Sequence, residues 1–427
     1  MKKISFILIP SLLCIIASHA YSKHIYHANT QYLTGDWHGK RTDWAEQGIK
    51  PDAMLFTDSA YLLSGGRNPG AKPETSTHFN IGVALDLQKL VGWKGVKVRA
   101  TVAARQGQSM GVRDLQDPSA PQLSNSQVTF GRGNQNTRLA EFSIEKQFDS
   151  GVNIKGGWIS MGSDFDVMSC NFQNSAFCGA QMGKWQSNIW MNNPVAQWGA
   201  RIKYDLNSSW MTQIGVYEFD PDYGKSDNES HAWSLSTAHA DGVTLPIEVI
   251  WHPKSFINGL PGSYRVGAMY NTADDPKNQK NIETGAPEKH TYGEWIAIEQ
   301  QLISTGEHGQ GLQMFENFTW HDHETNKIAD TEQIGLEYVG IGENRTEDMI
   351  GLAFNREHLN HRFIKGQVAN GKHQFDAESE YNVELNYNCH IAKWLLVRPD
   401  VQYIIHPGAS HKVGNALVLG LSSQVIF

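Results

Sequence analysis

Residues 377–391, AESEYNVELNYNCHI, decide the fold because their two sets of alternate positions differ in kind. The odd positions are mostly apolar, and the even positions are charged or polar: Glu378, Glu380, Asn382, Glu384, Asn386, Asn388 and His390. Alternate side chains of a β-strand point to opposite faces of the sheet. The alternation therefore predicts a strand with one apolar face and one polar face.

The same alternation recurs along the whole chain, for example at 96–105, 196–205 and 395–406. Each such run is about 9–14 residues long, the length that a tilted strand needs to cross a bilayer. We expect about sixteen strands from this period-two pattern, at residues 54–63, 78–87, 95–105, 137–148, 152–160, 195–205, 209–219, 242–252, 262–272, 291–302, 311–321, 330–341, 347–357, 375–388, 393–405 and 414–427.

The connections between these strands are predicted to alternate between long and short. The long ones are 64–77, 106–136 and 161–194, and the intervening links are short, as at 88–94 and 149–151. Such asymmetry is typical of outer-membrane barrels, and a β-sandwich has no reason to keep it. The sequence predicts an all-β fold, a transmembrane antiparallel β-barrel with short periplasmic turns, long extracellular loops and both termini in the periplasm.

Composition excludes other classes of protein. The 44 acidic residues outnumber 36 Lys and Arg, so nucleic acid is not an expected partner. A mean hydropathy of −0.44 and a single long apolar run exclude a helical membrane bundle. That run, at 4–17, follows Lys2 and Lys3 and precedes the small residues Ser18 and Ala20. Residues 1–20 are therefore predicted to be a secretory signal peptide.

The mature chain is predicted to divide into two parts. Residues 21–53 form an N-terminal periplasmic segment, with a short helix between Asp36 as its cap and Gly48 as its stop. Residues 54–427 form the barrel. Because no water reaches the hydrocarbon, the apolar faces of the strands must look outward to outer-membrane lipid and the polar faces must line a lumen.

A barrel of about sixteen strands leaves an aqueous channel that side chains alone do not fill. The loop 161–194 is the candidate to narrow it; the alternative is that this loop caps the surface. Cys170 and Cys178 lie in it and can form a disulfide in an oxidising compartment. A metal site is not expected because no further ligands lie nearby in sequence, and no cofactor is predicted. Cys389 is predicted to be a buried or lipid-facing thiol.

Several motifs follow one another along the chain: 32–42 (YLTGDWHGKRT), 45–49 (AEQGI), 163–165 (SDF), 170–174 (CNFQN), 177–179 (FCG), 193–194 (NP), 197–201 (QWGAR), 398–408 (RPDVQYIIHPG) and 415–420 (NALVLG). In these motifs the chain resembles the carbohydrate-selective outer-membrane porins of the OprB family. The resemblance implies passive uptake of sugars such as glucose and no enzymatic activity. His38, Lys40 and Trp158 depart from the family's pattern.

The phase of the alternation selects candidate residues for the pore. Inward charged positions give sugar hydroxyls partners that donate and accept hydrogen bonds. The predicted substrate-binding or pore-lining residues are Arg99, Arg105, Glu141, Arg201, Glu378 and Glu380, with Trp185 or Trp190 from the loop 161–194 as a stacking surface. Of these, Arg99, Arg105 and Glu141 are expected at the narrowest zone.

Two other functions remain open at this stage. One is a general diffusion porin without sugar preference, and the other is an outer-membrane barrel hydrolase. No persuasive Ser-His-acid set supports the hydrolase, since His358 and His361 fall in an expected loop. The expected partners are small sugars, outer-membrane lipid and the outer-membrane assembly machinery, which would read the terminal Phe427. A monomer and a homo-oligomer such as a trimer both remain open.

Overall fold

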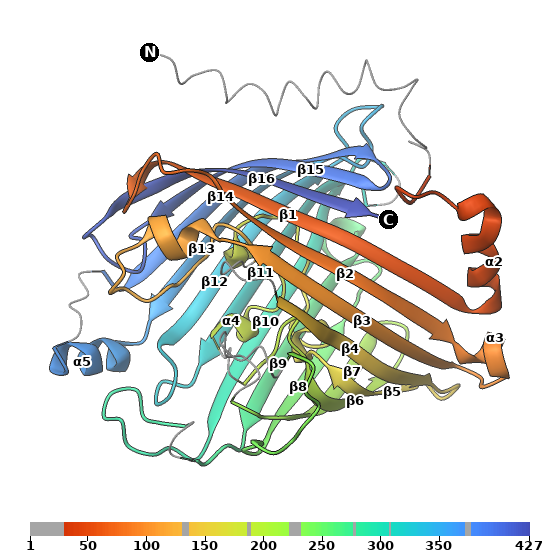
Figure 1. Cartoon of the computed structure of the whole chain (residues 1–427), viewed down its shortest axis with the longest axis horizontal. Coiled ribbons are helices and arrows are strands. Elements are labelled where there is room, and N and C mark those ends of the chain that lie inside the picture. Colours follow the sequence, from red (N-terminus) through yellow and green to blue (C-terminus); the bar gives the residue numbers. More distant parts are fainter. Residues whose placement is uncertain are drawn as a thin grey trace.

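The computed structural model describes residues 30–129, 136–185, 189–221, 232–275, 279–306, 309–371 and 377–427. Within these ranges sixteen antiparallel strands form one closed barrel, in which each strand pairs with its sequence neighbours and β1 closes on β16 (Figure 1). The strands are β1 (Ile49–Gly66), β2 (Glu74–Asp86), β3 (Val96–Gly107), β4 (Asn136–Gln147), β5 (Val152–Ile159), β6 (Gln197–Asp205), β7 (Trp210–Glu218), β8 (Val243–Trp251), β9 (Gly262–Asn271), β10 (Thr291–Ser304), β11 (Gly311–His321), β12 (Ile328–Val339), β13 (Met349–Leu359), β14 (Ser379–Ala392), β15 (Leu395–Ile405) and β16 (Gly414–Ile426).

Each predicted strand has its counterpart, and the largest difference lies at the first. β1 begins at Ile49 rather than at residue 54, because 49–53 extend beyond the end of β16 and pair with β2 alone. Pro51 and Asp52 interrupt the apolar alternation there, and a strand tolerates proline at such an unpaired edge. The predicted signal peptide, residues 1–20, lies outside the described residues.

The helices cap the two ends of the barrel. α2 (Lys40–Gln47) and α3 (Leu87–Val91) lie at one end and α5 (His361–Ala369) at the other (Figure 1). α2 ends at Gly48, with φ 100°, as predicted, but its N-cap is Gly39 and not the predicted Asp36. The described part of the chain contains no helix with the length and apolarity that crossing a membrane requires.

The predicted alternation of connection lengths fails at the first strand pair. The β1–β2 connection spans only 67–73, and the β2–β3 link contains α3. Asp86 ends β2 and caps this helix, since its Oδ1 accepts a 3.0 Å hydrogen bond from the backbone N–H of Gln88. α3 has only five residues, which is too short for a helical periodicity to be recognised in the sequence.

The two faces of the strands are inverted relative to a soluble barrel. The side chains of Ile214 and Leu385 are each 51% exposed on the outer face, whereas the neighbouring Gln213, Glu384 and Asn386 are buried inside. An apolar exterior around a polar interior is what a barrel needs when the hydrocarbon core of a lipid bilayer surrounds it.

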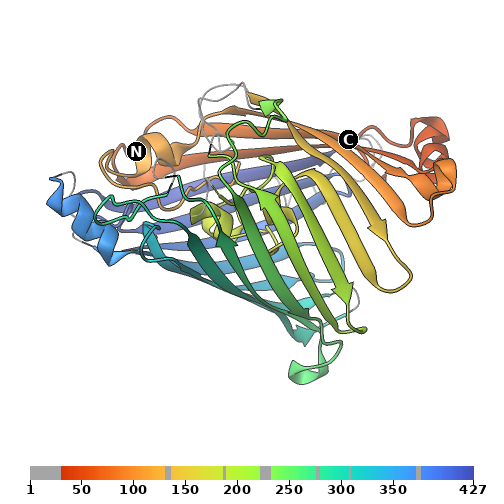
Figure 2. The same ribbon diagram turned by 90° about the horizontal axis from the view of Figure 1, so that it is seen from below.

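Two loops fold into the lumen and fill much of it. The first lumen loop, 108–129, follows β3, and the second lumen loop, 160–196, follows β5. Most of their described residues are buried, and α4 (Met182–Trp185) of the second loop lies within the ring of strands (Figure 2). The second lumen loop is therefore the constriction that the sequence favoured, and it is not a surface cap.

Candidate functional site

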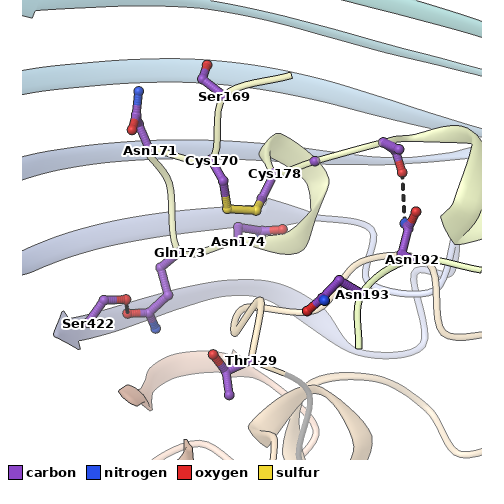
Figure 3. The surroundings of a disulfide bond; sticks show 12 residues. Thr129, Ser169, Cys170, Asn171, Gln173, Asn174, Cys178, Asn192, Asn193 and Ser422 are labelled. Carbon is purple, nitrogen blue, oxygen red and sulfur yellow. Dashed lines mark hydrogen bonds between the residues drawn. A yellow bond between two sulfur atoms is a disulfide. The ribbon is translucent and has the colours of Figure 1, made fainter. Parts of the chain in front are cut away.

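The disulfide predicted in the second lumen loop is present between Cys170 and Cys178 (Figure 3). It closes a turn that contains η4 (Ser175–Phe177). Phe172 and Phe177 of this turn are buried and pack against each other, with ring centroids 5.4 Å apart. Phe172 also contacts Phe315 of β11 at 5.6 Å, so the apolar side of the turn is fixed on the barrel wall.

Buried carboxylates of the wall hold the polar side of the second lumen loop. Both oxygens of Glu384 on β14 accept backbone hydrogen bonds, from Gln173 N–H at 2.8 Å and from Asn174 N–H at 2.7 Å. Glu248 on β8 likewise accepts from the backbone N–H of Asp166 at 3.1 Å and from Nε1 of Trp295 at 2.9 Å. Charge-assisted hydrogen bonds of this kind are stronger than neutral ones, which fixes an otherwise irregular segment.

The first lumen loop is anchored in the same way. Glu380 accepts a 3.0 Å hydrogen bond from the backbone N–H of Ser124 and a 2.7 Å hydrogen bond from the backbone N–H of Gly408. Asp58 on β1 accepts from the backbone N–H of Thr129 at 2.7 Å. The first loop was not recognised from sequence as a lumen element.

The two lumen loops also bind each other. The backbone N–H of Val128 donates to the carbonyl of Gln173, and the N–H of Ser175 donates to the carbonyl of Asn125, both at 2.8 Å. Ser422 of β16 adds a wall contact, since its hydroxyl donates to Oε1 of Gln173 at 2.8 Å (Figure 3). The constriction is thus one hydrogen-bonded unit of two loops rather than one loop alone.

This arrangement revises two predicted site residues, Glu380 and Trp190. Glu380 is fully buried under the first lumen loop, so it anchors that loop and does not face open lumen. Glu378 is exposed and precedes β14, where its backbone carbonyl accepts from Leu359 N–H. Trp190 is 1% exposed and packs edge-on against Trp295, with ring centroids 5.4 Å apart, so its ring offers no stacking surface. The side chain of Trp185 lies outside the described part of the structure.

Strand phase alone could not separate these roles. The alternation shows that Glu380 points inward, but it does not show whether water or a folded loop stands opposite. A loop without regular periodicity carries no such signal in its sequence, and its contacts come from residues far away along the chain.

Arg99, Glu141 and Arg201, predicted as inward charges, do come together in one row of ion pairs, here called the charge ladder. Its seven members alternate in sign across β1, β3, β4, β5 and β6 and the second lumen loop: Asp52, Arg99, Glu141, Lys155, Asp164, Arg201 and Glu145. Four of them, Asp52, Glu145, Lys155 and Asp164, were not among the predicted site residues.

The distances show that every cation of the ladder lies between two carboxylates. Arg99 lies 3.0 Å from Asp52 and 3.3 Å from Glu141. Lys155 lies 3.5 Å from Glu141 and 3.3 Å from Asp164.

The far end of the ladder repeats this arrangement. Arg201 lies 3.3 Å from Asp164 and 3.4 Å from Glu145. The side chains of Arg99 and Asp52 are 40% and 41% exposed. At the other end Glu145 is 36% exposed but its partner Arg201 only 5%, so the Asp52–Arg99 pair is the open end of the ladder.

Arg105 lies further along β3 and outside the ladder. Its Nε donates to Nδ1 of His78 on β2 at 3.3 Å, and its Nη2 donates to the carbonyl of Asn193 in the second lumen loop at 3.4 Å. It is half-buried and faces the same side of the strand as Arg99. The predicted narrow zone is therefore split into a region at the ladder and a second region at Arg105.

Two smaller predictions concern cysteine and metal. Cys389 is buried, and Nη2 of Arg345 lies 2.9 Å from its sulfur. Among the described residues no group of three or more His, Cys, Asp or Glu side chains is placed to hold a metal ion.

Comparisons with known proteins agree with this architecture. The family model described as "Carbohydrate-selective porin, OprB family" matches residues 71–427. Porin B of Pseudomonas aeruginosa is 36% identical over 96% of this chain and 95% of its own length. A putative porin, QuiX, of Acinetobacter baylyi is 34% identical over 93% of each chain.

Solved structures give the same result. The high-pH structure of Pseudomonas putida OprB has a TM-score of 0.87 at 34% identity, covering 95% of this chain and 100% of that one. The low-pH structure of the same protein has a TM-score of 0.60 at 27% identity, covering 93% and 99%. The chain belongs to the OprB family of carbohydrate-selective porins, non-enzymatic β-barrel channels of the outer membrane.

Proposed function

We propose that this porin conducts neutral sugars such as glucose, and that the open end of the charge ladder is where their hydroxyl groups bind. The observation that supports this most directly is the pairing of every ladder charge with an opposite one. The alternation of three cations with four carboxylates presents hydrogen-bond donors and acceptors side by side.

Sugar hydroxyls can use both kinds of partner. Each hydroxyl donates one hydrogen bond and accepts others, so a guanidinium beside a carboxylate matches it. Arg99 and Asp52 are the ladder residues most open to solvent, and there a sugar can replace water. Exposed ion pairs contribute little stability of their own, about 0–1 kcal/mol, so they can exchange partners at low cost.

The two lumen loops supply the narrowing that selection needs. They are held by Glu248, Glu380 and Glu384 and by each other, so the width of the channel is fixed by hydrogen bonds on both sides. Sugar binding inside must remain weak, because a tightly bound solute would block conduction. Rapid exchange at the half-exposed end of the ladder meets this condition.

Other partners belong to the same proposal. We infer that outer-membrane lipid surrounds the apolar outer face. The stacking of Trp210 on Trp251, with ring centroids 5.7 Å apart, supports an aromatic belt at the membrane interface. The assembly machinery is proposed to read Phe427. Homo-oligomerisation stays a prediction.

Liposome swelling tests the proposed function. Vesicles containing the porin should swell faster in glucose than in an uncharged amino acid of similar size. Arg99→Gln should lower the glucose rate about fivefold, the effect of losing one hydrogen bond worth about 1 kcal/mol. Lys94→Gln, in the exposed β2–β3 link, is the control and should not change it.

The outcomes separate the competing functions. Equal rates for glucose and the amino acid in the wild type would leave a general diffusion porin. An unchanged glucose rate in Arg99→Gln would remove the ladder from the sugar path.

A further inference from the structure

Two inward arginines near the lumen loops lack the balance of the charge ladder. In the pairing of β2, β3 and β4, Arg105 lies opposite His78 and Arg138 lies opposite Ala103. Ala103 and Arg105 share one face of β3, so both guanidinium groups project from the same side of the sheet. They are diagonal neighbours across adjacent strands and are close enough to repel each other.

Neither arginine has a carboxylate within ion-pair distance among the residues that the structure describes. Arg105 donates only to His78 and to the Asn193 carbonyl, and Arg138 makes no side-chain hydrogen bond within that part of the chain. Asp58 on β1 attracts Arg105 electrostatically without forming an ion pair with it in the described part of the chain.

Asp58 is, however, already occupied. Its Oδ2 accepts from the backbone N–H of Thr129 at 2.7 Å, and its Oδ1 lies 2.7 Å from the hydroxyl of Ser422, whose single proton it shares with Oε1 of Gln173. Its negative charge thus holds the first lumen loop on the wall. Arg105 and Arg138 are both half-buried, and the acid that attracts Arg105 is committed elsewhere.

The contrast with the ladder suggests a ligand of opposite charge. Along one strand, Arg99 has two carboxylate partners, whereas Arg105 has none among the described residues. In a narrow lumen with low-dielectric walls, an unbalanced positive pair concentrates anions. Guanidinium groups bind carboxylates through two parallel hydrogen bonds, which selects carboxylate over a simple halide by geometry.

We propose that Arg105 and Arg138 form a binding site for the carboxylate of a polyhydroxy acid, so that the channel also takes up sugar acids. The carboxylate lies between the two guanidinium groups, and the hydroxyl-bearing carbon chain extends into the lumen. The Asn193 carbonyl and the His78 ring are the neutral groups beside that position. The inference rests on the proposed function in one respect, since the polyol part uses the same sugar path.

The test uses the full porin in planar bilayers and liposomes, with sodium gluconate and glucose as the two probes. In the wild type, gluconate should lower the single-channel current saturably, and a KCl gradient should give a reversal potential on the anion-selective side. In Arg105→Gln/Arg138→Gln, the ratio of gluconate to glucose uptake should fall about tenfold, since both bidentate partners are lost. The reversal potential should shift toward cation selectivity.

A matched variant separates this site from the net charge of the lumen. Arg99→Gln removes one charge from the same strand, at a position that lies between two carboxylates. Because both probes use the sugar path, it should lower gluconate and glucose uptake together and change their ratio by no more than about twofold. Electrophoretic mobility of the unheated protein checks that each barrel is folded.

The two proposals fail in different ways. An unchanged ratio in the folded double variant, or an equal fall in both probes, would overturn the carboxylate site. Wild-type vesicles that take up gluconate but not glucose would overturn the sugar proposal and leave this one standing.

Discussion

The Nη2 of Arg41 donates a 2.7 Å hydrogen bond to the backbone carbonyl oxygen of Phe427, which joins α2 to the end of the last strand. The Arg41 guanidinium lies over the ring of Tyr32, 3.6 Å from its centroid, and 4.5 Å from that of Trp37. The N–H of Phe427 donates in turn to the carbonyl of Ala53 on β1. The N-terminal segment therefore holds together the two strands whose pairing closes the barrel.

Arg41→Gln should lower the stability of the barrel. The substitution removes a hydrogen bond from a charged donor, worth about 1.5–3 kcal/mol. The rings of Tyr32 and Trp37 also lose their contact with the guanidinium group. We expect the folded form to convert to the unfolded form at a lower temperature on electrophoresis after graded heating. Arg41→Lys keeps the charge but not the planar guanidinium group, so its unfolding temperature should lie between those of the wild type and Arg41→Gln. A midpoint for Arg41→Gln equal to that of the wild type would show that the contact does not support closure.

Glu384→Ala should loosen the second lumen loop without unfolding the barrel. The backbone N–H groups of Gln173 and Asn174 would lose their shared acceptor, at a cost of about 1–3 kcal/mol for each buried donor. Single-channel current should become larger and noisier. Glu378→Ala is the matched control, because it removes an exposed acid just before the same strand. Equal recordings for both variants would contradict the anchoring role.

Reduction of the Cys170–Cys178 disulfide should have a smaller effect of the same kind. The bond joins two cysteines that are eight residues apart in the sequence, and it restricts the conformational freedom of the turn between them. Dithiothreitol should increase current fluctuations in the wild type and leave the already altered Cys170→Ser/Cys178→Ser variant unchanged. A response of the same size in both proteins would point to another target of the reductant.

Glu141→Gln should shift the channel toward anion selectivity. Arg99 and Lys155 each lie within 3.5 Å of this carboxylate, so its neutralisation leaves both cations with one partner instead of two. The reversal potential in a KCl gradient measures the shift. Glu145→Gln, at the end of the ladder where only Arg201 is affected, should give a smaller change. If Glu145→Gln gave the larger shift, the ladder would not control ion flow in the way described.

The strands could be predicted because lipid imposes a simple rule on them. Residues such as Ile214 and Leu385 must face outward and their neighbours inward, so each strand can be recognised from the apolar–polar alternation of its own sequence. The exception, 49–53, pairs with β2 but lies beyond the end of β16, and its proline and acid break the pattern.

The interior could be predicted only in part. Arg99, Glu141 and Arg201 were predicted as inward charges because the phase of each strand places them on its polar face. Glu380 was misjudged because its partner, the backbone of Ser124, lies on a loop that reaches it across the lumen. Contacts of that kind are set by how two loops pack together, which no local pattern records.

The central claim is that a sugar binds weakly in a lumen narrowed by two loops. Planar-bilayer recording of single wild-type channels, titrated with glucose on one side, tests it most directly. The structure predicts that glucose reduces the ion current saturably, while an uncharged amino acid of similar size does not. A current that falls equally with both solutes, in proportion to their concentration and without saturation, would contradict it.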